Sequence, residues 1–251
     1  LLMSAPGLHL YHSPYSTCSQ KVRLCLWEKN LPFEVTEIHF WKNEHLTPEY
    51  LALNPNGVVP TLLHDGAPII DSSVIVEYLD EVFPQTPMSP PDAMGRAKMR
   101  AWMRYLEEVP TTAIRVPSFN KVFVQLWQDK TDDEIAAQAA ARPLRKGMYQ
   151  EMGRQGFGAD KYDDSLERLT MTINRMESAL ATHEWLCGDT IMLPDICVVP
   201  TIDRMEDIGL AHLWDQAPNV QRWWAAVKSR PSFDKTYVPG SRVSSRYEIA
   251  N

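Results

Sequence analysis

The hydrophobic positions in the first 85 residues change between two spacings. The segment "GLHLYH" alternates apolar and polar residues and predicts a short strand. Over residues 16–30 the apolar spacing becomes helical, with Val22, Cys25 and Leu26 on one face. A Leu-Pro pair follows and ends the helix, because the residue before a proline disfavours the helical conformation.

Four further segments continue this mixture of strand and helix. "FEVTEIHF" alternates as a second strand, and "LTPEYLALN" has the Thr cap and early Pro of a short helix. "VVPTLLHDGAPIID" predicts a hairpin around its Asp-Gly turn, and "SSVIVEYLDEVFP" is an amphipathic helix. The order β-α-β-α-β-β-α predicts an α/β layer, a thioredoxin-like domain, over residues 3–84.

A proline-rich segment separates this region from a different pattern. "PQTPMSPPD" holds four prolines in nine positions and predicts an extended linker over residues 85–92. From there the apolar spacing is helical almost throughout, so residues 93–251 are expected to form an all-α domain. Prolines 110 and 117 should end or kink its first helix, and "RKGMYQEMGRQGFG" is expected to be a loop.

Composition narrows the classes of function. No run of about 18 apolar residues occurs, so we expect no membrane span. The formal net charge of -7 argues against a nucleic-acid surface. Four cysteines fit no zinc spacing, so no metal is expected. The opening "LLMSAPG" is too short for a secretory signal, which favours reduced thiols and a cytoplasmic location.

The segment "SPYSTCSQKVR" places hydroxyls and a thiol where the first helix begins. Ser16 can be simply the helix cap. A helix N-terminus is also the positive end of the helix dipole, which lowers the pKa of a nearby thiol. That thiol can belong to Cys18 or to a bound cofactor, with a serine hydroxyl donating to the sulfur. Three side chains are therefore candidates for activating or supplying the reactive thiol: Ser16, Cys18 and Ser19.

Two residue pairs suggest a receptor for a small peptide. We expect the Val59-Pro60 bond to be cis, which in a thioredoxin-type layer leaves the backbone of Val59 to pair with a peptide ligand. A helix cap alone would account for the presence of Asp71 and Ser72 as well as a binding role would. The N–H groups of that helix N-terminus can also bind a carboxylate, and Asp71 can pair with an ammonium. A carboxylate receptor beside an ammonium receptor suits the α-amino acid end of a peptide.

Taken together, these motifs resemble the cytosolic glutathione transferase superfamily. The resemblance runs from "YHSPYSTCSQKVRLCL" through "NPNGVVPTLLHDG" and "IDSSVIVEYLDEVFP" to "LPDICVVP". It implies a thioredoxin-like domain that binds glutathione, an all-α domain with the second-substrate pocket, and a homodimer. "STCSQKVRL" is similar to motifs of zeta-class maleylacetoacetate isomerases and of tetrachlorohydroquinone reductive dehalogenases. The layout, with its long "TDDEIAAQAAARPLRKGMYQEMGRQGF" segment, resembles the β-aryl etherases of lignin degradation.

The resemblance implies a role for each candidate. In the zeta-class pattern Ser16 activates glutathione and Cys18 lies nearby, in the dehalogenase pattern Cys18 is catalytic, and in the etherase pattern Ser19 activates. For glutathione itself, the resemblance implies that the backbone of Val59, beside Pro60, binds the cysteinyl residue. It implies that Asp71 and Ser72 bind the γ-glutamyl end, and that Lys42 or His45 binds the glycine carboxylate.

The second substrate is expected against the helical domain. The pocket candidates are Arg104, Tyr105 and Arg115, with Tyr15 as a further candidate for the pocket or for thiol activation. The segment "RKGMYQEMGRQGF" is expected either to lie over the pocket or to be only a surface loop. One departure concerns the buried cap of the second domain, where Met192 stands in place of Ser or Thr, three residues before Asp195. We expect this cap to be rebuilt, with Thr190 nearby.

The sequence therefore predicts a glutathione transferase whose bound thiolate attacks a hydrophobic electrophile, aromatic or conjugated. Alternatives on the same site are β-aryl ether cleavage, isomerisation of the maleylacetoacetate type, and reductive dehalogenation or thiol transfer through Cys18. An alternative of another class is a non-catalytic module that binds glutathione or a partner protein.

Overall fold

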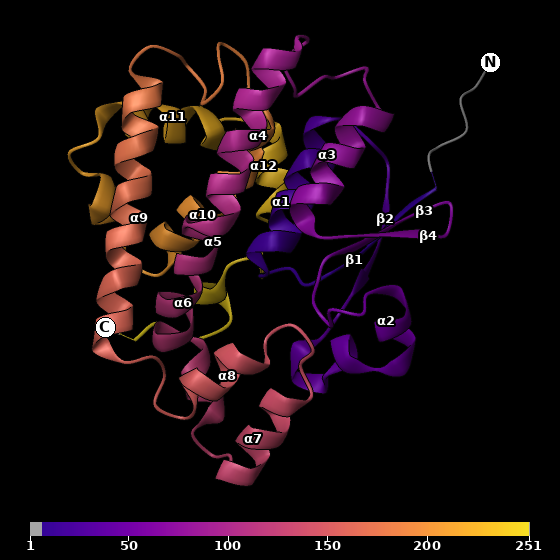
Figure 1. The fold of residues 1–251 in the computed structure, drawn as a ribbon, viewed down its shortest axis with the longest axis vertical. Coiled ribbons are helices and arrows are strands. Elements are labelled where there is room, and N and C mark those ends of the chain that lie inside the picture. Colours follow the sequence, from indigo (N-terminus) through magenta and orange to yellow (C-terminus); the bar gives the residue numbers. More distant parts are fainter. Residues whose placement is uncertain (1–6, 251) are drawn as a thin grey trace.

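The computed structural model describes residues 7–250. Residues 3–6 of the predicted first domain, most of the "LLMSAPG" opening and the last residue of the predicted second domain lie outside the described part. Within it, a small sheet with helices on its faces comes first, and a larger bundle of helices follows (Figure 1). The predicted architecture, an α/β thioredoxin-like layer followed by helices, is confirmed.

The sheet has four strands in the order β2-β1-β3-β4. Its strands are β1 (Leu8–His12), β2 (Glu34–Glu37), β3 (Thr61–His64) and β4 (Ala67–Ile70). β1 and β2 are parallel, whereas β3 pairs antiparallel with both β1 and β4. The predicted second strand stops at Glu37, because a 3-10 turn over Phe40–Lys42 follows instead.

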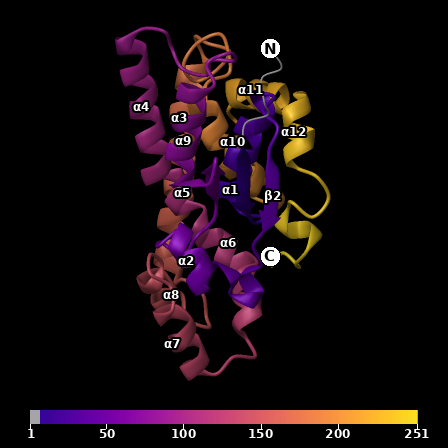
Figure 2. The ribbon, with the colours of Figure 1, turned by 90° about the vertical axis from the view of Figure 1, so that its right-hand side faces the viewer.

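Three helices complete the first region: α1 (Thr17–Glu28), α2 (Pro48–Leu53) and α3 (Ser72–Val82). α1 packs against α3 on one side and against α10 and α12 of the helical region on others (Figure 2). This position buries polar residues of α1 as well as its apolar face of Val22, Cys25 and Leu26. Gln20 donates to the carbonyl of Ser241, and Arg23 donates to the carbonyl of Thr236. α1 is therefore a central helix shared by both regions.

The second region begins after the proline-rich segment. Its helices are α4 (Ala93–Glu108), α5 (Pro110–Ala113), α6 (Arg115–Lys121), α7 (Asp132–Ala140), α8 (Lys146–Met152), α9 (Ala159–Leu180), α10 (Leu193–Asp207), α11 (Pro218–Lys228) and α12 (Pro231–Thr236). α4 ends just before Pro110, as predicted. Pro117 lies in the first turn of α6, where a missing N–H costs no intrahelical bond. α10 is buried along most of its length and forms the centre of the bundle.

The rebuilt cap of α10 uses a tryptophan. Asp195 is fully buried, and its carboxylate accepts hydrogen bonds from the backbone of Leu186 and Met192 and from the indole of Trp223. Burial raises the pKa of Asp195 to about 6, while these three donors act in the opposite direction. Trp223, from α11, supplies the side-chain donor; Thr190 makes no hydrogen bond to Asp195 among the described residues.

Residues 132–152 form a small substructure at one end of the molecule, beside α2 and below α6 (Figure 1). It packs on a second, separate hydrophobic core, to which it contributes Ile135 and Met152 and which Val116, Trp127 and Phe157 complete from outside the substructure. The expectation of a loop over "RKGMYQEMGRQGFG" was wrong for its first half, which forms α8. The helix forms because Met152 fits this core, with Met148 and Tyr149 packed against it.

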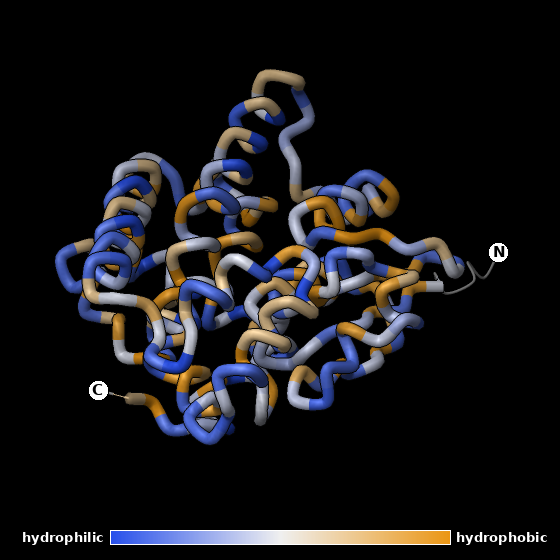
Figure 3. Tube along the Cα trace, turned by 60° about the horizontal axis from the view of Figure 1, so that its bottom comes forward, coloured by the Kyte–Doolittle hydropathy of each residue, from blue (hydrophilic) through white to orange (hydrophobic). Residues whose placement is uncertain are grey.

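Polar and apolar positions alternate along the outer helices (Figure 3). Among the described residues 7–250, no helix combines the length and apolar character needed to cross a bilayer.

Candidate functional site

The first turn of α1 presents a hydroxyl with a hydrogen still available. Ser16 is the N-cap, and its Oγ accepts the N–H of Ser19 at 3.3 Å. Its own N–H donates to the carbonyl of Ser13 at 3.1 Å, which fixes the residue in place. A hydroxyl that accepts at the cap keeps its O–H hydrogen for another partner. Ser16 is only half-buried, so that partner can be a ligand.

The other two candidates on this turn differ sharply from one another. Cys18 is half-buried and has a free thiol. Ser19 has no exposed surface, and its Oγ accepts the N–H of Ser13 at 3.2 Å. Ser19 thus holds the β1–α1 turn together from inside, while Ser16 and Cys18 remain near the surface of the turn.

A buried lysine links this turn to the next helix N-terminus. Lys21, one turn beyond Cys18, donates to Ser72 Oγ at 3.0 Å and forms an ion pair with Glu107 of α4. Burial lowers the pKa of Lys21, but the charge and hydrogen bond of Glu107, together with the nearby Cys197 and Cys18, raise it by more in total, so the side chain stays charged. The sequence pattern did not single out Lys21, because its two partners lie 51 and 86 residues away.

The N-terminus of α3 carries a carboxylate and a hydroxyl. Asp71 caps the helix: its Oδ1 accepts the N–H of Ser73 at 2.9 Å, the hydroxyl of Ser73 at 2.6 Å and the N–H of Val74 at 3.3 Å. Partial burial raises the pKa of Asp71, but these hydrogen bonds lower it by more. Its Oδ2 makes no hydrogen bond within residues 7–250. Ser72 accepts from Lys21 and so keeps its own hydroxyl hydrogen.

The segment before β3 is held rigidly. The Val59-Pro60 peptide bond is cis, as predicted. The preceding carbonyl, that of Val58, accepts from the hydroxyl of Tyr50 at 2.7 Å and from Nδ2 of Asn54 at 3.0 Å. Tyr50 of α2 and Asn54 at its C-terminal end thus fix the backbone just before Val59, which leads into β3.

The two candidates before α2 have different surroundings. Lys42 is about half exposed, 45%, and its ammonium lies 4.7 Å from the centre of the Trp41 ring. His45 is buried against Phe40, and burial together with the charge of Arg142 lowers the pKa of His45 to about 4. His45 is therefore neutral at physiological pH, and Lys42 carries the positive charge of this segment.

An aromatic cluster lies beside the first turn of α1. Tyr15 is buried among Phe40, Phe123 and Tyr247, with ring centroids about 6 Å apart in each case. Burial is the main reason that the pKa of Tyr15 is raised, so its phenol stays protonated. The sequence pattern missed Tyr247, because only the folded chain brings the C-terminal segment to this point.

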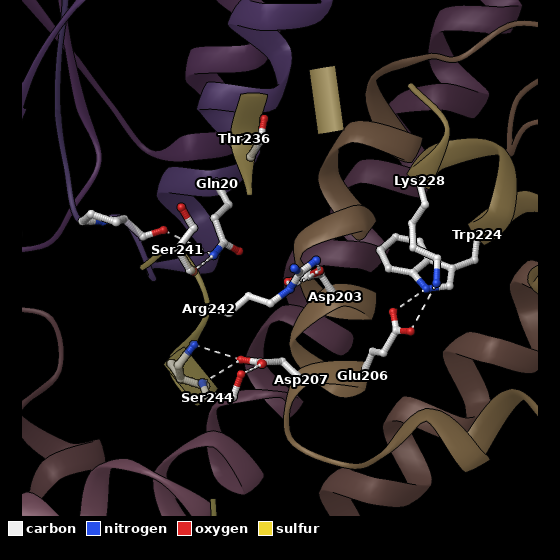
Figure 4. Close-up of polar contacts among 12 residues, drawn as sticks. Gln20, Asp203, Glu206, Asp207, Trp224, Lys228, Thr236, Ser241, Arg242 and Ser244 are labelled. Carbon is white, nitrogen blue, oxygen red and sulfur yellow. Dashed lines mark hydrogen bonds and ion pairs between the residues drawn. The ribbon is translucent and has the colours of Figure 1, made fainter. Parts of the chain in front are cut away.

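The C-terminal segment is fixed to α10 by an ion pair and hydrogen bonds where it crosses that helix (Figure 4). Arg242 pairs with Asp203 at 2.6 Å, and the backbone of Ser244 donates to Asp207 at 3.3 Å. These contacts place Tyr247 over Tyr15, and they close one side of the aromatic cluster.

The three pocket candidates Arg104, Tyr105 and Arg115 lie on two different helices, the first two on α4 and the third on α6. Arg104 is exposed, 62%, and pairs with Glu77 of α3 at 3.0 Å. The hydroxyl of Tyr105 bonds to Thr172 at 3.1 Å, and its ring lies under Arg175, so its polar contacts are with α9. Arg115, the first residue of α6, is half-buried. A further arginine, Arg145, lies within electrostatic range of Cys18, Asp71 and Arg115.

This arrangement suits a small peptide thiol. The N-terminus of α3 offers a carboxylate receptor, Val59 offers backbone groups, and the N-terminus of α1 offers a dipole and a hydroxyl for a sulfur atom.

Comparison with known proteins agrees with this geometry. The family description "Glutathione S-transferase, N-terminal domain" matches residues 15–82, and "Glutathione S-transferase, C-terminal domain" matches residues 135–231. The glutathione S-transferase TCHQD of Arabidopsis thaliana is 26% identical over 91% of this chain and 88% of the relative.

Protein LigF of Sphingobium sp. strain SYK-6 is similar in sequence and structure. It is 26% identical over 94% of this chain and 95% of its own length. The crystal structure of the β-etherase LigF superposes with a TM-score of 0.82 over 92% of this chain and 98% of LigF, at 25% identity. A glutathione transferase from Burkholderia graminis with two glutathione molecules bound per subunit superposes with a TM-score of 0.70, at 25% identity, over 92% of this chain and 87% of that protein. The chain belongs to the glutathione S-transferase family.

Proposed function

We propose that this protein binds glutathione, ionises its thiol at the N-terminus of α1, and directs the thiolate at a hydrophobic electrophile. The proposal rests on the burial and hydrogen bonding of Ser16. It caps α1 as an acceptor, is half-buried, and retains a hydroxyl hydrogen that a thiolate can accept. The first-turn N–H groups and the helix dipole add to the stabilisation of the anion.

Ser16 is favoured over its two rivals by burial and hydrogen bonding. Ser19 is fully buried and already accepts from Ser13, so it serves the turn rather than a ligand. Cys18 is accessible, and a route through its thiol would begin with a mixed disulfide. Tyr15 is buried in the aromatic cluster with a raised pKa, which suits a pocket wall better than a thiol activator.

The remaining candidates bind the peptide. The hydroxyl and N–H of Ser72 take the γ-glutamyl carboxylate, and Oδ2 of Asp71 faces the ammonium. The backbone of Val59 pairs with the cysteinyl residue beside Pro60. Lys42 takes the glycine carboxylate in preference to His45, which is neutral and buried. Arg104 and Tyr105 make contacts with α3 and α9, which leaves Arg115 of α6 as the pocket residue.

A second candidate reaction is cleavage of a β-aryl ether. It is favoured by the likeness to the β-etherase LigF over nearly the whole chain. In that reaction the thiolate forms a carbon–sulfur bond, the carbon–oxygen bond breaks, and the aryloxide leaves with the electron pair. The aromatic cluster around Tyr15 is suited to an aryl group.

A homodimer in the cytoplasm remains our expectation for the assembly. Val74 of α3 and Met94 of α4 are exposed apolar side chains on helices that follow one another in the chain. Light scattering of the purified protein measures the mass directly, and a monomer at working concentration would reject the dimer.

The test is to measure turnover of Ser16→Ala, Cys18→Ala and Ser19→Ala with 1-chloro-2,4-dinitrobenzene, lignin-type aryl ethers, maleylacetone and chlorinated hydroquinones. The proposal predicts a loss of roughly a hundredfold in Ser16→Ala, within the range for one positioned catalytic group, and little loss in Cys18→Ala. Loss of activity only in Cys18→Ala would reject it. Glutathione binding without turnover of any of these compounds would favour the non-catalytic alternative.

A further inference from the structure

Two arginines near the thiol site have no acidic partner. Arg115 begins α6, Arg145 precedes α8, and both are half-buried. Within residues 7–250 neither guanidinium forms a hydrogen bond or an ion pair. Other half-buried arginines do: Arg230 pairs with Glu28 at 2.6 Å, and Arg242 pairs with Asp203 at 2.6 Å. Two partly desolvated cations without a partner are costly, so their placement needs a reason.

Arg204 donates both to Ser118 of α6 and to the carbonyl of Tyr15, which places α6, and with it Arg115, beside the turn that leads into α1. Burial and the positive charge of Arg115 lower the pKa of Arg145, whereas Cys18 and Asp71 act on Arg145 in the opposite direction. Asp71 is the only carboxylate among these influences, and its Oδ1 is already engaged by Ser73 and Val74. The two guanidinium groups, which have no ion-pair partner among residues 7–250, therefore leave this part of the site positively charged.

The turn that carries Arg145 is held between two rigid parts of the molecule. The neighbouring Arg142 stacks 4.2 Å from the ring centre of Tyr149 and bonds to Gln138 at 3.0 Å. On the other side, Pro143 lies against Gly57, where an added side-chain carbon would come within 3.0 Å of its Cδ. The α7–α8 substructure thus presents Arg145 at the edge of the first domain by packing on both sides.

We propose that Arg115 and Arg145 form an anion subsite for the second substrate, which carries a carboxylate next to its electrophilic carbon. This rests on the proposed function, because the peptide's own charged groups already have receptors at Ser72, Asp71 and Lys42. A carboxylate accepts well-aligned hydrogen bonds from guanidinium groups and removes the repulsion between the two arginines. The electrophile would then be oriented by its anion, with its ring against the aromatic cluster.

The experiment compares two electrophiles that differ in one charge: 2-chloro-3,5-dinitrobenzoate, whose carboxylate is next to the reacting carbon, and its methyl ester. Both are assayed with Arg115→Gln, Arg145→Gln and the double variant. Arg154→Gln is the matched control, because Arg154 lies just beyond α8, where it pairs with Asp132 rather than facing Cys18. Arg145→Lys keeps the charge, and thermal unfolding of every variant shows that it is folded.

We expect kcat/KM for the benzoate to fall about tenfold in each single variant, which corresponds to about 1.4 kcal/mol. The loss with the ester should be at least about threefold smaller than the loss with the benzoate, Arg154→Gln should behave as the wild type, and Arg145→Lys should recover part of the loss. An equal effect on both electrophiles would overturn the proposal. A rise in the KM for glutathione with both electrophiles would also overturn it and assign the arginines to the peptide.

Calorimetric binding of unreactive 3,5-dinitrobenzoate, in the presence of S-methylglutathione, separates this proposal from the proposed function. If the wild type turns over neither electrophile but binds the acid in a way that Arg145→Gln abolishes, the subsite stands and the proposed function fails. If the wild type turns over both electrophiles with no preference for charge and binds no acid, the function stands and the subsite fails.

Discussion

Replacing Trp223 by phenylalanine should destabilise the protein by an amount that increases with pH. The indole N–H donates to the fully buried carboxylate of Asp195 at 2.9 Å, and the backbone of Leu186 and Met192 supplies the other two donors. Phenylalanine removes this donor and also part of a fully buried ring, and the cost of the lost packing is the same at every pH. A hydrogen bond to a charged group contributes about 2 kcal/mol, and one to a neutral group about 1 kcal/mol.

The sign of the pH dependence follows from the raised pKa of Asp195. Its value is about 6 in the folded protein, against an ordinary 3.8, so the folded state binds this proton more tightly. The stabilisation from protonation is present below pH 3.8 and is lost as pH rises through about 6. Removing the indole raises this pKa further, and each unit adds about 1.4 kcal/mol to the loss at high pH.

The assay is urea unfolding followed by circular dichroism at a fixed protein concentration, near pH 5 and near pH 8. We expect the cost of Trp223→Phe to be larger near pH 8 than near pH 5 by about 1 kcal/mol or more, in addition to a packing cost that is common to both pH values. Trp224→Phe is the control: its indole donates to Glu206 at 2.7 Å, a side chain that is 41% exposed (Figure 4). Water replaces that bond, so its cost should be smaller and independent of pH. Equal losses for Trp223→Phe at both pH values would refute the reasoning.

Two other substitutions test the buried charges. Glu107→Gln should cost about 3 kcal/mol in the same assay, because it leaves the ammonium of Lys21 buried without its carboxylate, whereas Lys21→Met should cost less; the reverse ranking would contradict this. Arg242→Met should cost about 2 kcal/mol near pH 8 and less near pH 5. Burial raises the pKa of Asp203 to about 6 and Arg242 holds it down, so Asp203 loses its stabilising proton as pH rises through that value. A loss that is the same at both pH values would count against this role of Arg242.

Local patterns in the chain were enough to predict the sheet and the three helices around it. Each strand pairs with neighbours whose turns have recognisable chemistry, such as the Asp65-Gly66 hairpin between β3 and β4. The candidate residues of the two helix N-termini also followed from capping rules, because Ser16 and Asp71 act on backbone groups within three residues.

What the sequence could not indicate depends on contacts far along the chain. Lys21 has the pattern of a solvated residue, yet it is buried because α3 and α4 bring Ser72 and Glu107 to it. The helix α8 formed where polar residues and glycines suggested a loop, because the core around Trp127 accepts Met152. Ser19 and Ser16 have similar sequence surroundings, and only the fold buries one and leaves the other near the surface.

The central claim is that Ser16 lowers the pKa of the glutathione thiol. The direct test is a pH titration of the ultraviolet absorbance of the thiolate in bound glutathione, in a Cys18→Ala background so that only one thiol titrates at this site. We predict a bound thiol pKa well below the usual value of about 8.5, a rise of about one unit or more on adding Ser16→Ala, and no rise on adding Ser19→Ala. An unchanged pKa in the Ser16 variant would contradict the account.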